Sequence, residues 1–301
     1  MIAPMMVDAE AVRSVGPAAA LLLERMAQRR VQTLAIEADR EWLAEITPHY
    51  RRLLSRMEGA RLLYRIRRGR YVLAPRGTFS VAQAAPAELQ AARTLEPGDY
   101  FISHLSALIA HRLTDVHSDE VYASVRQSSG RRGKHRVELP SGTLRIVTVA
   151  DARWPAEGSS ELEDVRALPE SMEFIWRAGV ERTLVDALAR PDLCAGFETV
   201  VGCWVAAKNR QIAWDTVCQI AARQGSSMIR RTAYLLRLIG LGAVAERAFP
   251  DLHGRSIRVP LDRSDSFGMG VKSLVRDRAT GVVVNVPPQY LQAWTGATSL
   301  T

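Results

Sequence analysis

Eight arginines lie between Thr47 and Arg70, and this segment contains a single acidic residue, Glu58. A folded protein that crowds like charges so closely must bear their mutual repulsion, so the pattern favours a polyanionic partner. A planar guanidinium group can hold a phosphate through two hydrogen bonds, or the O6 and N7 atoms of guanine. The segment therefore predicts binding to double-stranded DNA. The alternative interpretation is a solvated basic surface, or arginines that pack on a partner protein.

The first half of this segment has the pattern of a helix. Thr47-Pro48 predicts the helix start, because a threonine oxygen caps a free amide and proline loses nothing at the first helical position. Gly59 predicts the helix end. Between them, four apolar residues at helical spacing form one stripe that would face the core. They are Tyr50, Leu53, Leu54 and Met57.

A hairpin and two more helices complete the expected domain. Alternating apolar residues over 62–66, a turn over 67–69 and a return over 70–73 predict a basic β-hairpin, or wing. Upstream, residues 17–29 and 34–46 each show a helical apolar pattern. Three helices and a wing predict a winged helix-turn-helix domain over residues 17–77. The acids of the second helix would then face away from the duplex: Glu37, Asp39, Glu41 and Glu45.

In a winged helix the third helix enters the major groove and the wing follows the phosphates or the adjacent minor groove. The residues expected on base edges and nearby phosphates are His49, Arg51, Arg52, Ser55 and Arg56. The residues expected to bind the DNA backbone from the wing are Arg65, Arg67, Arg68 and Arg70.

The remaining sequence predicts a second and larger domain, so the expected fold class is α+β with a mixed, mainly helical second part. Residues 1–16 are expected to form a flexible leader, residues 78–99 a linker rich in alanine and proline, and residues 100–295 the second domain. Within it we expect a helix over 100–113, strands over 121–125, 144–149, 257–259 and 281–286, and four helices over 179–241. A basic loop at 131–134 fits either a second DNA contact or a solvated hairpin tip.

Composition places the chain among ordinary globular proteins. It has 301 residues, a formal net charge of +8, 47% hydrophobic and 24% charged residues, which is enough for two domains with buried cores. Cys194, Cys203 and Cys218 form no CxxC pair and stand in apolar patterns, so we expect buried thiols. No apolar stretch is long enough for a membrane span, which favours a cytoplasmic protein without a membrane partner.

The sequence contains no recognised catalytic motif: no phosphate-binding GxxxxGK[ST] loop, no HExxH, no GxGxxG after a strand and no GxSxG. His104 and His111 could share a metal only with further ligands that the sequence does not supply. Glu181, Asp186 and Asp192 lie in helical patterns, whereas a metal-dependent nuclease needs its acids on adjacent strands. We therefore expect no catalytic residue, no metal and no cofactor, and we do not expect an enzyme.

Three segments together resemble one known family. The wing sequence LLYRIRRGRYVL over 62–73, the segment YFISHLSA over 100–107, and ERTLVD over 181–186 with Pro191, Gly196 and Phe197 are similar to the AbiEi antitoxins of type IV toxin–antitoxin systems. The resemblance covers roughly residues 17–290. It implies a winged helix that represses its own operon at repeats, and a larger domain that counters a nucleotidyltransferase-like toxin. It also implies a protein without catalytic activity.

Two other functions remain open at this point. A ligand-responsive transcription factor would use its second domain to sense a small molecule, and gene neighbourhood would separate it from an antitoxin. A DNA-cleaving enzyme would use the winged helix for targeting, and incubation with plasmid and Mg²⁺ or Mn²⁺ would reveal it.

Overall fold

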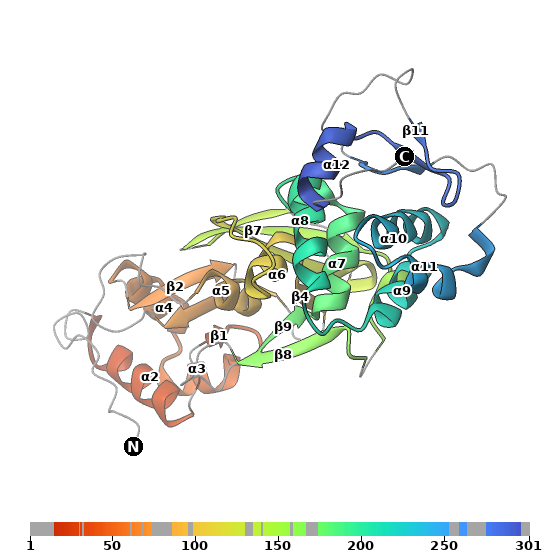
Figure 1. Cartoon of the computed structure of the whole chain (residues 1–301). Coiled ribbons are helices and arrows are strands. Elements are labelled where there is room, and N and C mark those ends of the chain that lie inside the picture. Colours follow the sequence, from red (N-terminus) through yellow and green to blue (C-terminus); the bar gives the residue numbers. More distant parts are fainter. Residues whose placement is uncertain are drawn as a thin grey trace. The chain divides into compact units, whose positions relative to one another are not determined.

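The computed structural model describes residues 15–29, 31, 33–60, 62–67, 69–73, 86–95, 99–129, 135–139, 141–156, 159–166, 174–252, 259–263 and 275–295 (Figure 1). Most of the expected leader, Arg68 and the basic loop at 131–134 lie outside the described residues. The chain divides into two compact units. The first unit is Met1–Pro97 with Arg136–Leu144, and the second unit is Gly98–His135 with Arg145–Thr301. Both units mix helices and strands, so the α+β fold class is confirmed.

The first unit places its elements in the order helix, strand, two helices, two strands, helix. Its helices are α2 (Pro17–Gln28), α3 (Arg40–Ile46), α4 (Tyr50–Gly59) and α5 (Ala87–Thr94). Its strands are β1 (Thr33–Ala35), β2 (Leu63–Arg67) and β3 (Arg70–Leu73). They form one antiparallel sheet in the order β1-β3-β2. Strand β6 (Arg136–Leu139) also belongs to this unit and contacts α5.

The predicted apolar stripe of α4 lies in the core of the first unit. Leu53, Leu54 and Met57 are buried, and Tyr50 packs against the same cluster. The helix ends at Gly59 as predicted, and Gly69 in the β2–β3 turn has a φ of 78°, which glycine adopts without strain. Val15 is also buried in this core, so the end of the expected flexible leader belongs to the folded unit.

The helix expected over 34–46 was wrong in its first half. Thr33–Ala35 is strand β1, paired with β3, and the helix begins only at Arg40. The Asp39 carboxylate accepts hydrogen bonds from the Ala35 amide (2.7 Å) and from Trp42 Nε1 (2.9 Å). These bonds stabilise a turn between strand and helix, in the way that aspartate side chains compete with helical backbone pairing.

The expected linker at 78–99 contains a packed helix. Helix α5 buries Leu89, Ala91 and Thr94 and contacts strand β2 of the first unit. Alanine and glutamine favour helices, and a short helix with a single large apolar residue, Leu89, resembles a linker in composition. The unit boundary therefore lies near residue 97 rather than 78.

The second unit contains a sheet covered by helices. Its strands are β4 (Tyr100–Ile102), β5 (Glu120–Arg126), β7 (Gly142–Val149), whose first residues count with the first unit, β8 (Leu162–Arg166) and β9 (Phe174–Ala178), in the order β7-β5-β4-β9-β8. Helices α6 (His104–Ala110) and α7 (Val180–Ala189) lie against β5 and β9 (Figure 1).

The helix expected over 100–113 was also wrong in its first residues. Tyr100–Ile102 is strand β4, antiparallel to β5 and parallel to β9. All three of its residues are buried because the strand is central in the sheet. A strand buried on both faces loses its alternating pattern and cannot be distinguished from a helix segment by periodicity. The helix α6 follows from His104.

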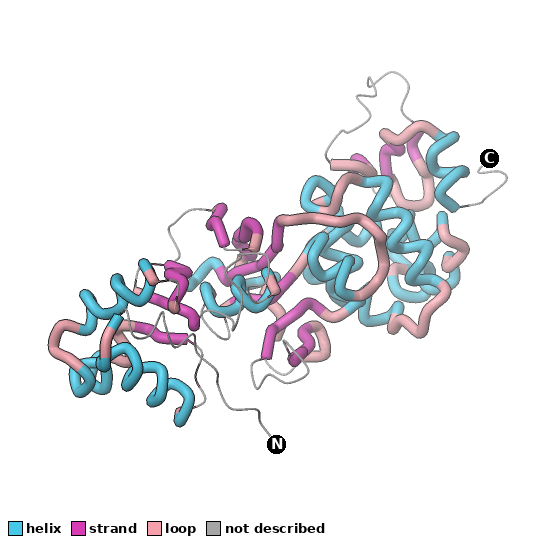
Figure 2. The backbone as a smooth tube through the Cα atoms, turned by 90° about the vertical axis from the view of Figure 1, so that its left-hand side faces the viewer, coloured by secondary structure: helices cyan, strands magenta, loops and turns pink. Residues whose placement is uncertain are grey.

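The four helices expected over 179–241 are present, and further short elements surround them. They are α7, α8 (Phe197–Lys208), α9 (Trp214–Arg223) and α10 (Ser226–Leu238), followed by α11 (Gly242–Ala248). Figure 2 shows the helices of this unit gathered together.

The second unit also contains four short 3₁₀-helices within the described residues. They are η2 (Gln127–Ser129), η3 (Asp151–Arg153), η4 (Pro191–Leu193) and η5 (Pro250–Leu252). Near the C-terminus, β10 (Val259–Pro260), β12 (Val282–Val284) and β11 (Val275–Arg276) form a small sheet, and α12 (Pro288–Thr295) packs on α8.

The helical core of the second unit is centred on Trp204, which is fully buried and donates a hydrogen bond from Nε1 to the Leu184 carbonyl (3.2 Å). All three cysteines are unpaired and buried in this core, as expected. Burial raises the pKa of Cys203 to about 12 and that of Cys218 to about 11, so both thiols stay protonated at neutral pH. Within the described residues no helix has the length and apolar character needed to cross a membrane.

Candidate functional site

The face of α4 opposite its buried stripe carries the predicted DNA-binding residues. His49, Arg51, Arg52, Ser55 and Arg56 are all exposed. Among the residues that the structure describes, the side chains of Arg51 and Arg52 have neither a hydrogen bond nor an ion pair. The first turn of the helix contains no acid, and no side chain caps it. Two uncompensated guanidinium groups therefore lie beside free amide groups, an arrangement that attracts phosphate.

Arg56 lies on the same helix but has a structural contact. Its Nη2 donates a hydrogen bond to the Val15 carbonyl just before α2. This bond ties α4 to the start of α2, so Arg56 contributes to packing of the first unit. Ser55 is exposed beside it and makes no such contact among the described residues.

Two of the four acids between α2 and α4 have local contacts. Glu45 pairs with Arg25 of α2 at 2.7 Å, and Asp39 is held in the β1–α3 turn. Arg25 thus matches the charge of Glu45, and neutral donors hold the Asp39 carboxylate, so neither acid pairs with the arginines of α4.

The basic residues of the β2–β3 hairpin have different surroundings. Arg65 is exposed, whereas Arg70 is half-buried and donates a hydrogen bond from Nη1 to the Arg93 carbonyl of α5 (3.3 Å). Arg67 is the last residue of β2 and pairs with Arg70 in the sheet. Arg65 therefore faces solvent, whereas Arg70 is hydrogen-bonded to α5.

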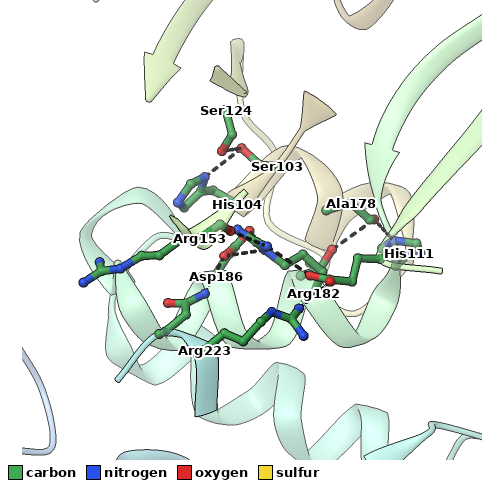
Figure 3. A network of polar contacts seen from close by, with 12 residues as sticks. Ser103, His104, His111, Ser124, Arg153, Ala178, Arg182, Asp186 and Arg223 are labelled. Atoms are coloured by element: carbon green, nitrogen blue, oxygen red, sulfur yellow. Dashed lines mark hydrogen bonds and ion pairs between the residues drawn. The ribbon is translucent and has the colours of Figure 1, made fainter. Parts of the chain in front are cut away.

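A buried polar cluster occupies the second unit, around Arg182 of α7 (Figure 3). Arg182 is only 2% exposed. Its Nε lies 2.9 Å from both carboxylate oxygens of Asp186, and its Nη1 donates to Glu161 (3.1 Å) and to the Arg153 carbonyl (3.0 Å). The helical spacing i, i+4 places Asp186 beside Arg182, whereas Glu161 comes from a distant segment.

Arg223 of α9 completes the balance of charge in this cluster. It pairs with Glu161, and Gln224 donates from Nε2 to Asp186 (3.2 Å). Two cations thus match two acids, and the guanidinium of Arg182 also lies over the ring of Phe101 at 5.5 Å. Burial lowers the pKa of Arg182, but Asp186 and Glu161 more than offset that effect and raise the pKa overall. The cluster joins three elements that are distant in sequence.

His104 lies at the edge of this cluster and is neutral at physiological pH. It is 3% exposed, and the Ser103 hydroxyl lies 2.8 Å from its Nδ1. Ser124 donates to Ser103 (2.9 Å), so the Ser103 proton is available for the imidazole nitrogen. Burial lowers the pKa of His104 to about 4, with further lowering from Arg190 and Arg182. His104 also has a φ of 51°, an uncommon backbone conformation for a residue other than glycine.

His111 and His104 do not share a ligand. His111 donates from Nε2 to the Ala178 carbonyl at 2.8 Å and so fixes α6 to the end of β9. Within the described residues, no three His, Cys, Asp or Glu side chains are arranged to hold a metal. Ser103 has no exposed surface, so its contact with His104 cannot present a nucleophile to a substrate. The geometry is that of a satisfied internal network.

Two cavities adjoin the cluster in the second unit. One, of about 320 Å³, is lined by residues that include His104, Arg182 and Asp186. The other, of about 490 Å³, is lined by residues that include Arg231 and the start of α10. Both cavities share four lining residues: Arg153, Ala189, Gln224 and Arg263.

Sequence reasoning did not find Glu161, Arg223 or Arg231. Arg231 had a detectable signal, because it stands between Met228 and Leu235 on the buried stripe of α10, where an apolar residue is the norm. Glu161 had no such signal, because its partner Arg182 is 21 residues away.

Comparisons with known proteins give a fold but no family. No family model matches the chain, and no curated protein matches it. The crystal structure of the RV2827C protein from Mycobacterium tuberculosis is similar to this chain, with a TM-score of 0.64 and 14% sequence identity. The match covers 93% of this chain and 95% of that protein. At this identity the likeness concerns the fold alone.

Proposed function

We propose that this protein is a DNA-binding autorepressor and the antitoxin of a type IV toxin–antitoxin system, with a nucleotidyltransferase-like toxin as its counterpart. The first unit is then a winged helix-turn-helix domain, with α4 as the recognition helix and the β2–β3 hairpin as the wing. The second unit is then the antitoxin domain. The protein has no catalytic role in this proposal, and its partners are its own operator DNA and the toxin.

The observation that carries the DNA part is the two-sided character of α4. One side is buried in the core, and the other exposes Arg51 and Arg52 without a compensating acid among the described residues. The order helix, strand, helix, helix, strand, strand, with the sheet order β1-β3-β2, supports the assignment of a winged helix. An exposed helix with unpaired arginines beside a basic hairpin fits a major groove with flanking phosphates.

The antitoxin part is supported by the resemblance and by the places of its motifs. Two of the three segments that carry the resemblance, 100–107 and 181–186, meet in the buried cluster, where His104 and Asp186 line the same cavity. These motif residues therefore have a shared structural purpose in the second unit. A motif that maintains a core is expected to persist among proteins of one fold.

We expect Arg52→Ala to weaken binding to the operator by about 1 to 3 kcal/mol and to relax sequence choice, because a guanidinium on a base edge discriminates among bases. A gel shift with operator and scrambled duplexes measures both effects. Arg65→Ala is the matched control on the wing and should weaken binding to both duplexes equally. Equal affinity of the wild type for operator and scrambled DNA would exclude specific repression.

The salt dependence of binding provides a second measurement on the same duplexes. The logarithm of the association constant should fall linearly with the logarithm of salt concentration, by about 0.9 per neutralised phosphate. The Arg65→Ala variant removes one expected phosphate contact, so the magnitude of its slope should be smaller by about 0.9. A slope close to zero would contradict phosphate binding by the basic surface.

The antitoxin role requires a test in cells. Expression of the neighbouring nucleotidyltransferase gene should stop growth, and co-expression of this protein should restore it. Rescue by the full-length Arg52→Ala variant, expressed from an independent promoter, would separate neutralisation from repression. Growth arrest that persists in the presence of the wild-type protein would contradict the antitoxin assignment while leaving DNA binding intact.

A ligand-responsive regulator is the second candidate, and one observation favours it. The second unit contains two adjoining polar cavities beside the buried cluster. A neighbouring metabolic operon instead of a toxin gene would favour this candidate over the antitoxin.

A further inference from the structure

The larger cavity of the second unit has an unusual charge distribution. Arg153, Arg231 and Arg263 line it, and no aspartate or glutamate belongs to its described lining. None of the three guanidinium groups has an ion pair within the described part of the chain. Three cations around one cavity repel each other, and a bound anion would relieve that repulsion.

Arg231 is the most informative of these residues because it is buried. Only 3% of it is exposed, and its Nε and Nη1 donate to the carbonyls of Ser227 and Leu188. Its Nη2 has no partner among the described residues. Burial, and then repulsion from Arg263, lower the pKa of Arg231 to about 10, although the buried Asp262 raises it in part, so Arg231 remains a cation at neutral pH. A buried cation that forms no ion pair is costly.

The N-terminus of α10 lies at the same cavity. Gly225, Ser226 and Ser227 line it, and α10 has neither a side-chain cap nor an acid in its first turn. The amides of Ser226 and Ser227 have no backbone partner among the described residues. Free amides at the positive end of a 13-residue helix bind anions. Guanidinium groups, amides and hydroxyls thus converge, and all of them can donate to phosphate oxygens.

The adjoining cavity offers a different environment. Its described lining contains His104, which is neutral, the Gln224 amide, Asp186, whose charge is matched by Arg182, and Arg190, which pairs with Asp192. The other two cations of its lining, Arg153 and Arg263, are shared with the larger cavity. The two cavities, of about 490 and 320 Å³, fall within the usual size range of small-molecule sites. The larger cavity therefore suits a phosphate group, and the smaller cavity suits an uncharged polar group.

We propose that this pair of cavities binds a phosphate-bearing small molecule of nucleotide size, with its phosphate groups at Arg153, Arg231, Arg263 and the N-terminus of α10. Its uncharged part then extends towards His104 and Gln224. A small molecule is favoured over a DNA backbone, because Arg231 is too deeply buried for a duplex phosphate to reach. The inference is independent of the DNA-binding proposal, because it concerns the second unit alone.

Calorimetric titration of the full-length protein at constant ionic strength tests this site. Pyrophosphate and AMP should bind, whereas adenosine, which lacks phosphate, should bind at least about tenfold more weakly, the loss expected when charge-assisted hydrogen bonds are removed. Arg153→Gln and Arg263→Gln each change an exposed residue and should weaken pyrophosphate binding about tenfold. Arg278→Gln removes the same charge from an exposed position outside the cavity and should leave the affinity unchanged.

Three results would overturn the proposal. The first is failure of both pyrophosphate and AMP to bind above a matched chloride control. The second is an equal loss of affinity in Arg278→Gln and Arg263→Gln, which would indicate a general charge effect. The third is weakened operator binding by Arg153→Gln and Arg263→Gln without any binding of small anions, which would assign these arginines to DNA. A failed gel shift with wild-type protein would count only against the DNA-binding proposal.

Discussion

Arg182→Met is expected to lower the free energy of unfolding of the second unit by about 3 to 5 kcal/mol, because removal of one partner leaves buried charges uncompensated. Glu161 and Asp186 are 5% and 6% exposed, and each would lose its closest buried cation. Urea denaturation followed by tryptophan fluorescence measures the effect. Five of the six tryptophans belong to the second unit, so this signal reports mainly on that unit.

Arg223→Met is the matched control for this experiment. It removes the same charge from the same acid, Glu161, but the side chain of Arg223 is 46% exposed. Exposed ion pairs contribute about 0 to 1 kcal/mol, because water screens them and the long side chain loses entropy. Equal destabilisation by the two substitutions would contradict the view that the cluster depends on its buried guanidinium.

Acidification is expected to destabilise the second unit through His104. Its pKa in the folded state is about 4, against 6.5 as the ordinary value, so the unfolded chain binds the proton first as pH falls. The neutral, folded form keeps its full stability above pH 6.5, and the loss grows as pH decreases towards 4. The pKa difference corresponds to about 3 kcal/mol between pH 7 and pH 4. Denaturation curves at several pH values would measure it.

The substitution His104→Gln isolates this contribution from that of other groups. Glutamine does not titrate, so the variant should lose about 3 kcal/mol less than the wild type over this pH range. Asp192, whose pKa is lowered chiefly by its hydrogen bond with Arg190 and least by His104, contributes to acid sensitivity in both proteins, and most of its contribution cancels in the comparison. His117→Gln changes an exposed histidine and serves as the control. Identical pH profiles for wild type and His104→Gln would contradict the assignment.

The buried cluster also limits which residues can be substituted to test ligand binding in the two cavities. Arg182 and His104 line the smaller cavity, so substitutions there would change stability and ligand binding together. Arg153 and Arg263 are exposed, and their substitution tests the cavity without removing a buried charge. This difference in burial determines which variants can separate binding from folding.

Local patterns in the sequence were sufficient for the elements of the first unit that carry the basic surface. The apolar spacing of Leu53, Leu54 and Met57 defined the buried side of α4, and Gly69 marked the β2–β3 turn. These features depend on neighbours within a few residues, so periodicity and turn chemistry reveal them. The same reasoning failed for β1 and β4, because pairing with a distant strand decides whether a short apolar run is a strand.

The sequence by itself determined the helical segments of 179–241, the buried thiols and the exposed arginines of α4, since each follows from local spacing and charge. Only the tertiary structure decided that Arg182 meets Glu161, that Arg231 reaches the Leu188 carbonyl across 43 residues, and that His104 lies in the same cavity as Asp186. Such contacts join residues from separate elements, and their energies arise from burial, which depends on how the whole unit packs.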